Sequence, residues 1–323
     1  MTEAEVEDLN NQASTLMKRG IALLEEVRRE AAIDALYCFD EALALRRQIP
    51  ASHSPFQGYL LAACLLNRAD ALVRFNDAGP LAAAMTSYEE AIDVLRALPM
   101  DADPRYPRRL AMAYQNRALA LQLRGHDGDA AAAATAFADA LVVLDHEHSA
   151  GIEDRDYLRG VVWLNLSNLH AGSEASDAPV AAREAAVRAL ACVADAESQD
   201  IQAANVGLRA RHALCRLCAT SLSQMTDQTA SMPDDVHEAT DAVDDGLTLV
   251  RAWERRGVEI FRGVAFDLFR FGARVYALYQ PQFLAEFIGE NMDPAQSSPG
   301  YVADPDMTLA AHEAQGFILR NDA

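Results

Sequence analysis

The chain has 323 residues, a formal net charge of −20 and 51% hydrophobic residues, with roughly a fifth alanine but only 16 glycines and 12 prolines, which favours helices over strands. The acidic balance argues against a nucleic-acid partner, because a surface that follows phosphates needs positive charge. No run approaches the ~20 apolar residues that span a bilayer, and the acidic start lacks a secretory signal pattern. We therefore expect a cytoplasmic protein with no membrane contact.

One pattern of small, large, small and aliphatic residues recurs four times at a constant interval of 49 residues. The four copies are Ala35, Phe39, Ala42 and Leu43; Ala84, Tyr88, Ala91 and Ile92; Ala133, Phe137, Ala140 and Leu141; and Ala182, Ala186, Ala189 and Leu190. A residue pair upstream of each copy keeps the same interval: Arg19-Gly20, Arg68-Ala69, Arg117-Ala118 and Leu166-Ser167. Each unit thus has two parts.

Both parts of each unit carry apolar residues at spacings of three and four, which predicts a helical hairpin. Breakers separate the two parts at 76–80, 125–128 and 172–179. The small residues let two helices approach closely, and the aromatic residue fills the space beside them. One hairpin leaves part of its apolar stripe uncovered, so the hairpins are predicted to stack into an all-α solenoid.

The C-terminal third is less regular. A fifth unit is predicted over 203–256, with its second helix from Val236 to Trp253, and a sixth from Phe261 to Phe287. The stretch 291–305 is typical of a loop, and an apolar segment follows it. We predict a repeat domain over 1–290 and a C-terminal loop with a short capping helix over 291–323. The tail either caps the last repeat or folds back over the groove.

The sequence resembles the tetratricopeptide repeat (TPR). The segment Tyr114 to Leu121, followed by Arg124-Gly125, is similar to the first helix of that repeat, and Trp163 precedes Ser167 by four residues as in the family. The second-helix triad Ala84, Tyr88 and Ala91 also matches, as do Pro50 and Pro99 beyond their helices. The resemblance covers about residues 10–290, although 49 residues exceed the ~34 of the standard unit. It implies a right-handed α-solenoid of about six TPR-like hairpins, whose first helices line a concave, peptide-binding groove.

Seven residues are the candidates for contact with a partner. A polar residue stands two positions before each small packing residue, and carboxamides at such positions suit hydrogen bonds to an extended backbone. These positions hold Lys18, Asn67, Asn116 and Asn165, while Arg74 and Asn168 share the same face and Arg117 lies beside it. The alternative is structural: the asparagines satisfy backbone groups or face water, and Arg68 and Arg117 pair with acidic second helices.

Two other motifs contain residue types that bind metals. Cys215 and Cys218, with His212, lie along one helix face but lack the second ligand pair that a zinc site needs, so we expect buried thiols. His146-Glu147-His148 follows a helix and is expected to be a polar helix end, with chelation from a loop as the alternative.

The leading function is a non-catalytic scaffold or adaptor that binds a protein or peptide segment. The alternative is a regulatory receptor that binds a short peptide or small ligand in the groove. We expect no enzyme activity, metal or cofactor, and the sequence leaves a homodimer open.

Overall fold

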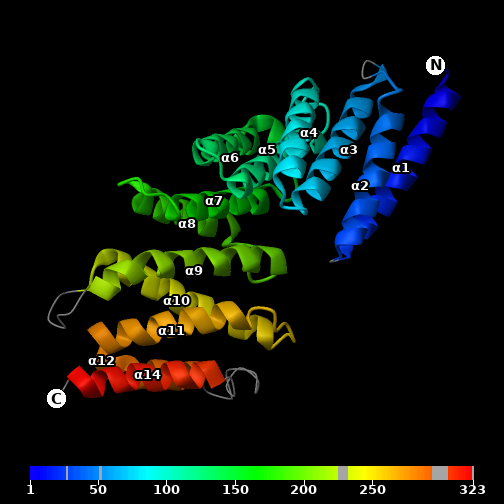
Figure 1. Ribbon diagram of the computed structural model, residues 1–323. Helices are drawn as coiled ribbons and strands as arrows, with labels where there is room; N and C mark the ends of the chain where they lie inside the picture. Colours follow the sequence, from blue (N-terminus) through cyan, green and yellow to red (C-terminus); the bar gives the residue numbers. More distant parts are fainter. Residues whose placement is uncertain (27, 51–52, 225–231, 293–304, 322–323) are drawn as a thin grey trace. The chain divides into compact units, whose positions relative to one another are not determined.

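The computed structural model describes residues 1–26, 28–50, 53–224, 232–292 and 305–321, and over these residues it contains helices and no strands (Figure 1). The chain forms two compact units, Met1–Arg155 and Asp156–Ala323, which are described separately below. Among the described helices, none combines the length and the apolar character that crossing a membrane requires. The prediction of an all-α protein is confirmed over the described residues.

Unit 1 consists of three helical hairpins (Figure 1). They are α1 (Glu3–Glu25) with α2 (Arg29–Arg46), α3 (Pro55–Val73) with α4 (Ala78–Arg96), and α5 (Arg105–Arg124) with α6 (Asp129–Asp145), followed by the 3-10 turn η2 (Glu147–Ser149). Helix α1 begins at a capping box in which Thr2 and Glu5 satisfy each other's backbone amides. Helix α5 ends at Gly125, whose φ of 65° is a left-handed conformation that glycine adopts freely.

Unit 2 holds the remaining helices that the structure describes. They are α7 (Arg155–Ala171), which starts one residue before the unit, α8 (Ala178–Val193), α9 (Ile201–Gln224), α10 (Asp234–Glu254), α11 (Arg262–Tyr279), α12 (Pro281–Asn291) and α14 (Pro305–Asn321). The helix predicted from Val236 to Trp253 is confirmed as α10. Most of the loop predicted over 291–305 lies outside the described residues.

The repeated small and aromatic residues form the core of unit 1. In all three copies the two alanines and the aromatic residue are between 0% and 2% exposed. Ala69 and Ala118 on the first helices are also fully buried. A Cβ added to Gly20 would lie 2.5 Å from the Phe39 ring, so only glycine lets α1 approach α2 this closely. The predicted close packing within each hairpin is therefore confirmed.

The fourth copy of the pattern lies in unit 2 and has no aromatic residue. Ala182, Ala186 and Ala189 are fully buried. Ala186 packs in a cluster with Leu214 of α9, and Leu190 of α8 packs against the same cluster.

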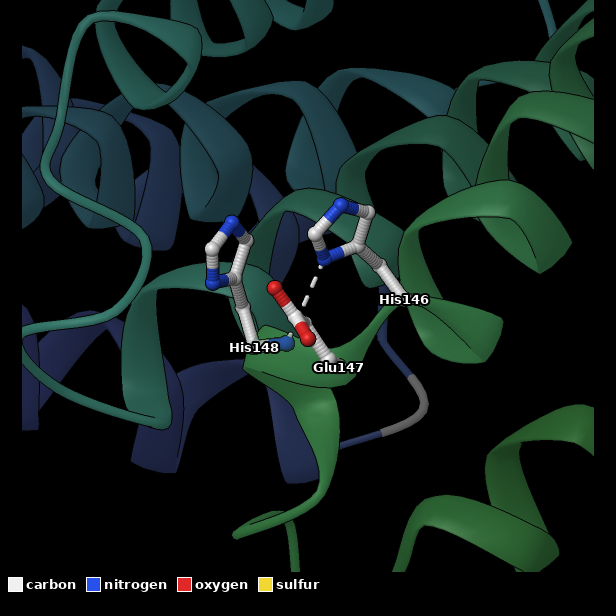
Figure 2. Close-up of side chains that lie close together, drawn as sticks. All are labelled: His146, Glu147 and His148. Atoms are coloured by element: carbon white, nitrogen blue, oxygen red, sulfur yellow. Dashed lines mark hydrogen bonds between the residues drawn. The ribbon is translucent and has the colours of Figure 1, made fainter.

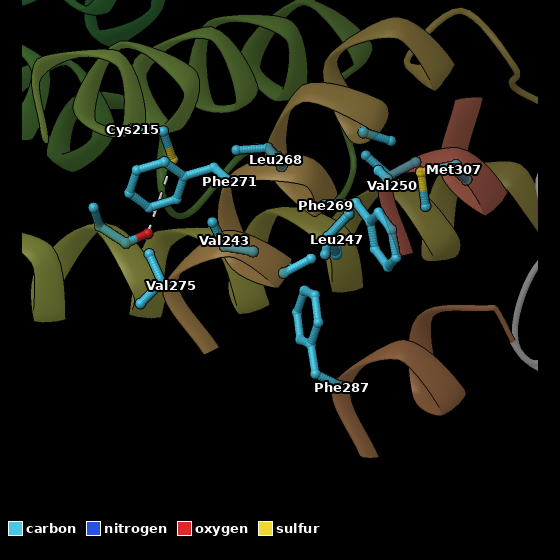
Figure 3. Packing of buried hydrophobic residues seen from close by; sticks show 14 of the residues in the cluster. Cys215, Val243, Leu247, Val250, Leu268, Phe269, Phe271, Val275, Phe287 and Met307 are labelled. Carbon is cyan, nitrogen blue, oxygen red and sulfur yellow. Dashed lines mark hydrogen bonds between the residues drawn. The ribbon is translucent and has the colours of Figure 1, made fainter. Parts of the chain in front are cut away.

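One core of unit 2 is aromatic and aliphatic (Figure 3). The rings of Phe269 and Phe287 stack with centroids 5.5 Å apart. Helix α14 packs against α11 and α12, and Met307 is buried in the same core. The C-terminal helix thus covers an apolar face of unit 2, which is what a cap does.

The helices pack in sequential pairs, which is compatible with a helical repeat protein. The superhelix, its hand and the number of six TPR-like hairpins stay predictions, as does the boundary at residue 290.

Candidate functional site

The predicted polar ladder occupies equivalent positions on the first helices. Lys18 on α1 is exposed, and Asn67, Asn116 and Asn165 on α3, α5 and α7 are half-buried. Lys18 and Asn165 make no side-chain hydrogen bond or ion pair with other residues that the structure describes. These two side chains are available to a partner.

The amides of Asn67 and Asn116 already have acceptors. Asn67 Nδ2 donates to the Ala63 carbonyl one turn earlier, at 2.8 Å. Asn116 Nδ2 reaches the carboxylate of Asp70 on α3, with nitrogen–oxygen distances of 3.2 and 3.4 Å. Tyr88 on α4 donates its hydroxyl to the same carboxylate at 2.6 Å. Asn116 therefore links two hairpins, whatever else it binds.

Burial dominates the electrostatics of this network. It raises the pKa of Asp70 above its ordinary value, although the hydrogen bonds from Tyr88 and Asn116 oppose the shift. Burial and the nearby Asp70 charge also raise the pKa of the Tyr88 hydroxyl. In this network the Asp70 carboxylate accepts hydrogen bonds from two donors, the Tyr88 hydroxyl and the Asn116 amide.

The other candidates are spread over two helices and the end of a third. Arg74 is exposed at the end of α3, where its charge favours the ionised form of Asp70. Asn168 is exposed on α7. Arg117 on α5 forms an ion pair with Glu89, with a nitrogen–oxygen distance of 3.5 Å. The structure leaves the binding role of all seven candidates as a prediction.

Arg68 and Arg117 make the ion pairs that the structural alternative predicts. Arg68 Nε lies 2.6 Å from a carboxylate oxygen of Asp40, and its Nη1 donates to the Ser87 hydroxyl at 2.7 Å. Both arginines therefore connect a first helix to a second helix of the preceding hairpin.

Two hollows on unit 1 are related to each other by the repeat. The first has a volume of about 250 Å³ and is lined by Asp40, Leu43, Ala44, Arg47, Leu65, Arg68, Thr86, Ser87 and Glu90. The second has a volume of about 310 Å³ and is lined by Glu89, Ile92, Asp93, Arg96, Tyr114, Arg117 and Asp139. Each residue of the second hollow is 49 positions after a residue of the first. The same site is thus built twice.

Each hollow holds two arginines and carboxylates from neighbouring second helices. In the first hollow, Arg47 Nη2 donates to both carboxylate oxygens of Glu90, at 2.7 and 2.8 Å. In the second, Arg96 Nε donates to the Tyr114 hydroxyl at 2.6 Å, and its guanidinium lies 5.4 Å from that ring centre. These side chains offer charged donors and acceptors to a partner.

Sequence reasoning missed Arg47 and Arg96 as site residues. The signal was present, because both arginines and the acidic pair Glu90 and Asp139 keep the 49-residue interval. The next position at the 49-residue interval, after Arg47 and Arg96, holds Asp145, so the arginine is not repeated a third time.

The two cysteines of α9 are buried thiols, as expected. The Cys218 Sγ lies 3.2 Å from the Asp235 carbonyl oxygen, and the Cys215 Sγ lies 3.9 Å from that of Ala239. Burial raises the pKa of Cys218 to about 12 and raises that of Cys215 as well. Both thiols stay protonated at neutral pH, so they are poor nucleophiles.

Unit 2 contains a cavity of about 340 Å³ between α10, α11 and α12. Its lining includes Asp244, Arg251, Tyr276, Phe287 and Glu290. The Tyr276 hydroxyl lies 3.3 Å from a carboxylate oxygen of Asp244. Burial raises the pKa of Asp244 and, with the nearby Asp244 charge, raises that of Tyr276 to about 12.

No family model and no curated protein matches the chain. A solved structure that is similar to it is the crystal structure of BtubC (BKLC) from P. vanneervenii, at 14% sequence identity and a TM-score of 0.54. The match covers 92% of this chain and 94% of that chain. At this identity the likeness concerns the fold, and the class it supports is an all-α protein of pairwise packed helices.

Proposed function

We propose that the protein is a non-catalytic scaffold or adaptor that holds a protein or peptide segment, and that the two hollows of unit 1 are part of its contact surface. The observation that supports this proposal is their equivalence under the 49-residue repeat. A segment that presents two suitably spaced polar side chains meets the same chemistry twice. Two linked contacts of this kind bind far more tightly than either contact alone.

The ion pair of Arg47 with Glu90 in the first hollow is weak enough for a partner to replace. The side chains of Arg47 and Glu90 are 53% and 39% exposed, and such exposed pairs contribute ~0–1 kcal/mol. A buried partner carboxylate that forms a forked contact with an arginine gains more than this. The Arg47 guanidinium can therefore donate to a partner with little loss in the free energy of unfolding.

The hollows and the asparagine ladder are separate hypotheses about one partner. The side-chain amides of Asn67 and Asn116 already donate hydrogen bonds within the chain. The side chains of Arg47 and Arg96, in contrast, are exposed. Of the two surfaces, the hollows carry the proposal, and Lys18 of the ladder adds a contact within unit 1. Asn165 and Asn168 of unit 2 stay separate predictions.

Peptides selected from a display library against the full chain would test the proposal. We expect the double variant Arg47→Ala/Arg96→Ala to weaken the selected peptides at least tenfold, and each single variant to weaken them by less. The control is Arg29→Ala, which removes a more exposed ion pair with Asp77 outside both hollows. The ladder variant Asn67→Ala/Asn116→Ala is predicted to cost ~1–3 kcal/mol of binding.

Thermal unfolding of each variant separates binding from folding. Unchanged affinity in the Arg47→Ala/Arg96→Ala variant would reject the hollows. If only the ladder variant loses binding and its melting temperature is unchanged, the partner binds in the groove that the sequence predicts and not in the hollows.

The cavity of unit 2 favours the alternative of a regulatory receptor. The lining has three carboxylates and one arginine, Arg251, so carboxylates prevail. With the rings of Tyr276 and Phe287 it suits a small cation, which aromatic faces and carboxylates both attract. Amines and carboxylic acids of similar size can be compared by thermal shift, with Asp244→Asn as the variant. Stabilisation by amines that Asp244→Asn abolishes supports the receptor, and equal responses to both classes contradict it.

A further inference from the structure

Three ligand-type side chains meet just beyond α6 (Figure 2). His146, Glu147 and His148 are all exposed, and one candidate ligand atom from each lies within 4.8 Å of the other two. The two imidazole rings stack with centroids 4.1 Å apart and an interplanar angle of 24°. The three side chains thus form one cluster on unit 1.

The local backbone explains why both histidines lie on the same side. Residues two apart on an α-helix point about 200° apart. Here α6 has ended, His146 is extended at φ −69° and ψ 150°, and the next residues form the 3-10 turn η2. Fully buried Ser149 fixes this turn, because its hydroxyl donates to the Val143 carbonyl at 2.6 Å.

The surroundings favour a cation. The cluster follows the carboxyl end of α6, which is the negative end of the helix dipole, and Glu147 adds a carboxylate. His146 Nδ1 accepts the backbone amide of His148 at 3.3 Å, so this nitrogen already presents a lone pair. A metal ion would replace a long and weak hydrogen bond.

We propose that His146, Glu147 and His148 bind a divalent transition-metal ion of the zinc class. Two imidazoles favour zinc, copper or nickel over magnesium or calcium, which prefer oxygen ligands. Tetrahedral bonds of ~2.0–2.2 Å bring neighbouring ligand atoms to about 3.4 Å, so ligand atoms that now lie within 4.8 Å of one another must approach by up to about 1.4 Å. Exposed side chains supply that movement by rotation.

The site leaves one coordination position of a tetrahedral ion open. Three protein ligands plus water or an outside group is the arrangement of an open zinc site. A histidine or carboxylate from a bound partner can take this position. The metal site is independent of the two hollows and stands without them.

Titration of the full chain with zinc chloride, followed by calorimetry at neutral pH, tests the proposal. We expect one zinc ion per chain and at least a tenfold loss of affinity in His146→Ala/His148→Ala. Glu147→Gln should lower affinity by a smaller factor, because an amide is a weaker ligand than a carboxylate. His126→Ala is the matched control, since His126 is also exposed on unit 1 but lies outside the cluster.

Circular dichroism of each variant should be unchanged, because all three side chains are exposed. Two results would overturn the proposal: zinc affinity that the double variant retains, or magnesium that binds as tightly as zinc. Zinc bound through Cys192 or another residue gives the first of these results.

Discussion

The two units bury their small residues alike but surround them differently. In unit 1 each pair of alanines brackets an aromatic ring, as Phe39, Tyr88 and Phe137 show. In unit 2 the equivalent position is Ala186, and Leu214 comes from the next helix to pack beside it. The small residues are therefore buried in both units, while an aromatic ring stands between them only in the copies of unit 1.

The ion pairs of the two units differ in how exposed they are. Unit 1 repeats ion pairs between its hairpins, and the pair of Arg47 with Glu90 is exposed. Unit 2 also has an exposed pair, Arg183 with Glu238. It adds a nearly buried pair, in which both terminal nitrogens of Arg211 donate to the Glu197 carboxylate at 2.7 and 2.8 Å. The Trp253 indole also donates to the Glu197 carbonyl. The repeated pairs are suited to exchange with a partner, whereas the buried pair fixes unit 2.

The largest effect should come from removing an aromatic ring of unit 1. Phe137→Ala leaves a cavity in a fully buried site, and we expect a loss of ~3–5 kcal/mol in the free energy of unfolding. Val142→Ala on the same helix is 67% exposed and should change stability by less than about 0.5 kcal/mol. Denaturant unfolding measures both, and equal effects would show that the ring does not hold the hairpin.

Breaking the buried pair of unit 2 should be nearly as costly. Arg211→Ala leaves the Glu197 carboxylate unpaired in a mostly buried site, which costs ~3 kcal/mol or more. The same change at Arg47 in unit 1 should cost ~0–1 kcal/mol, because that pair is exposed. Similar losses of unfolding free energy at the two sites would remove the distinction between the units.

A glycine substitution tests the close approach of α1 and α2. Gly20→Ala places a Cβ 2.5 Å from the Phe39 ring and should destabilise by ~1–3 kcal/mol. Gly263→Ala, in the first turn of α11, places its Cβ more than 4 Å from any atom outside its own helical turn and should be neutral or slightly stabilising. Melting temperatures of the two variants measure the difference. An unchanged melting temperature in Gly20→Ala would contradict the close approach of α1 and α2.

The smallest predicted effect is a pH dependence from Asp70. Its pKa is raised on folding, so the folded state holds the proton more tightly than the unfolded state, whose value is 3.8. This contribution to stability grows as pH falls through the folded pKa and is complete below the unfolded pKa. Any stability that Asp70→Asn gains at pH 7 should therefore shrink toward pH 4. A difference between variant and wild type that grows on acidification would reverse the assigned sign.

The regularity of the sequence explains which parts of unit 1 were predictable. Spacing alone identified the alanines and aromatic rings, because close helix packing restricts those positions to one residue type. The partner of the Tyr88 hydroxyl was not predictable, since Asp70 lies on another helix and follows no repeat. The same holds for unit 2, where Phe269 and Phe287 meet across α11 and α12 without any periodic signal.

The candidate site was predictable only in part. The ladder positions were found, but the internal acceptors of Asn67 and Asn116 depend on side-chain geometry. Arg47 and Arg96 follow the repeat, yet only the folded chain shows that each faces a hollow with another arginine.

Site-specific photo-crosslinking tests most directly whether the repeated hollows bind one partner segment. A photo-reactive residue would replace Thr86 in the first hollow or Asp93 in the second, both exposed, with Val142 outside both hollows as the control. We predict that one selected peptide crosslinks at both hollow positions and not at Val142. Crosslinks that form at neither hollow, while the peptide still binds, would contradict the proposal.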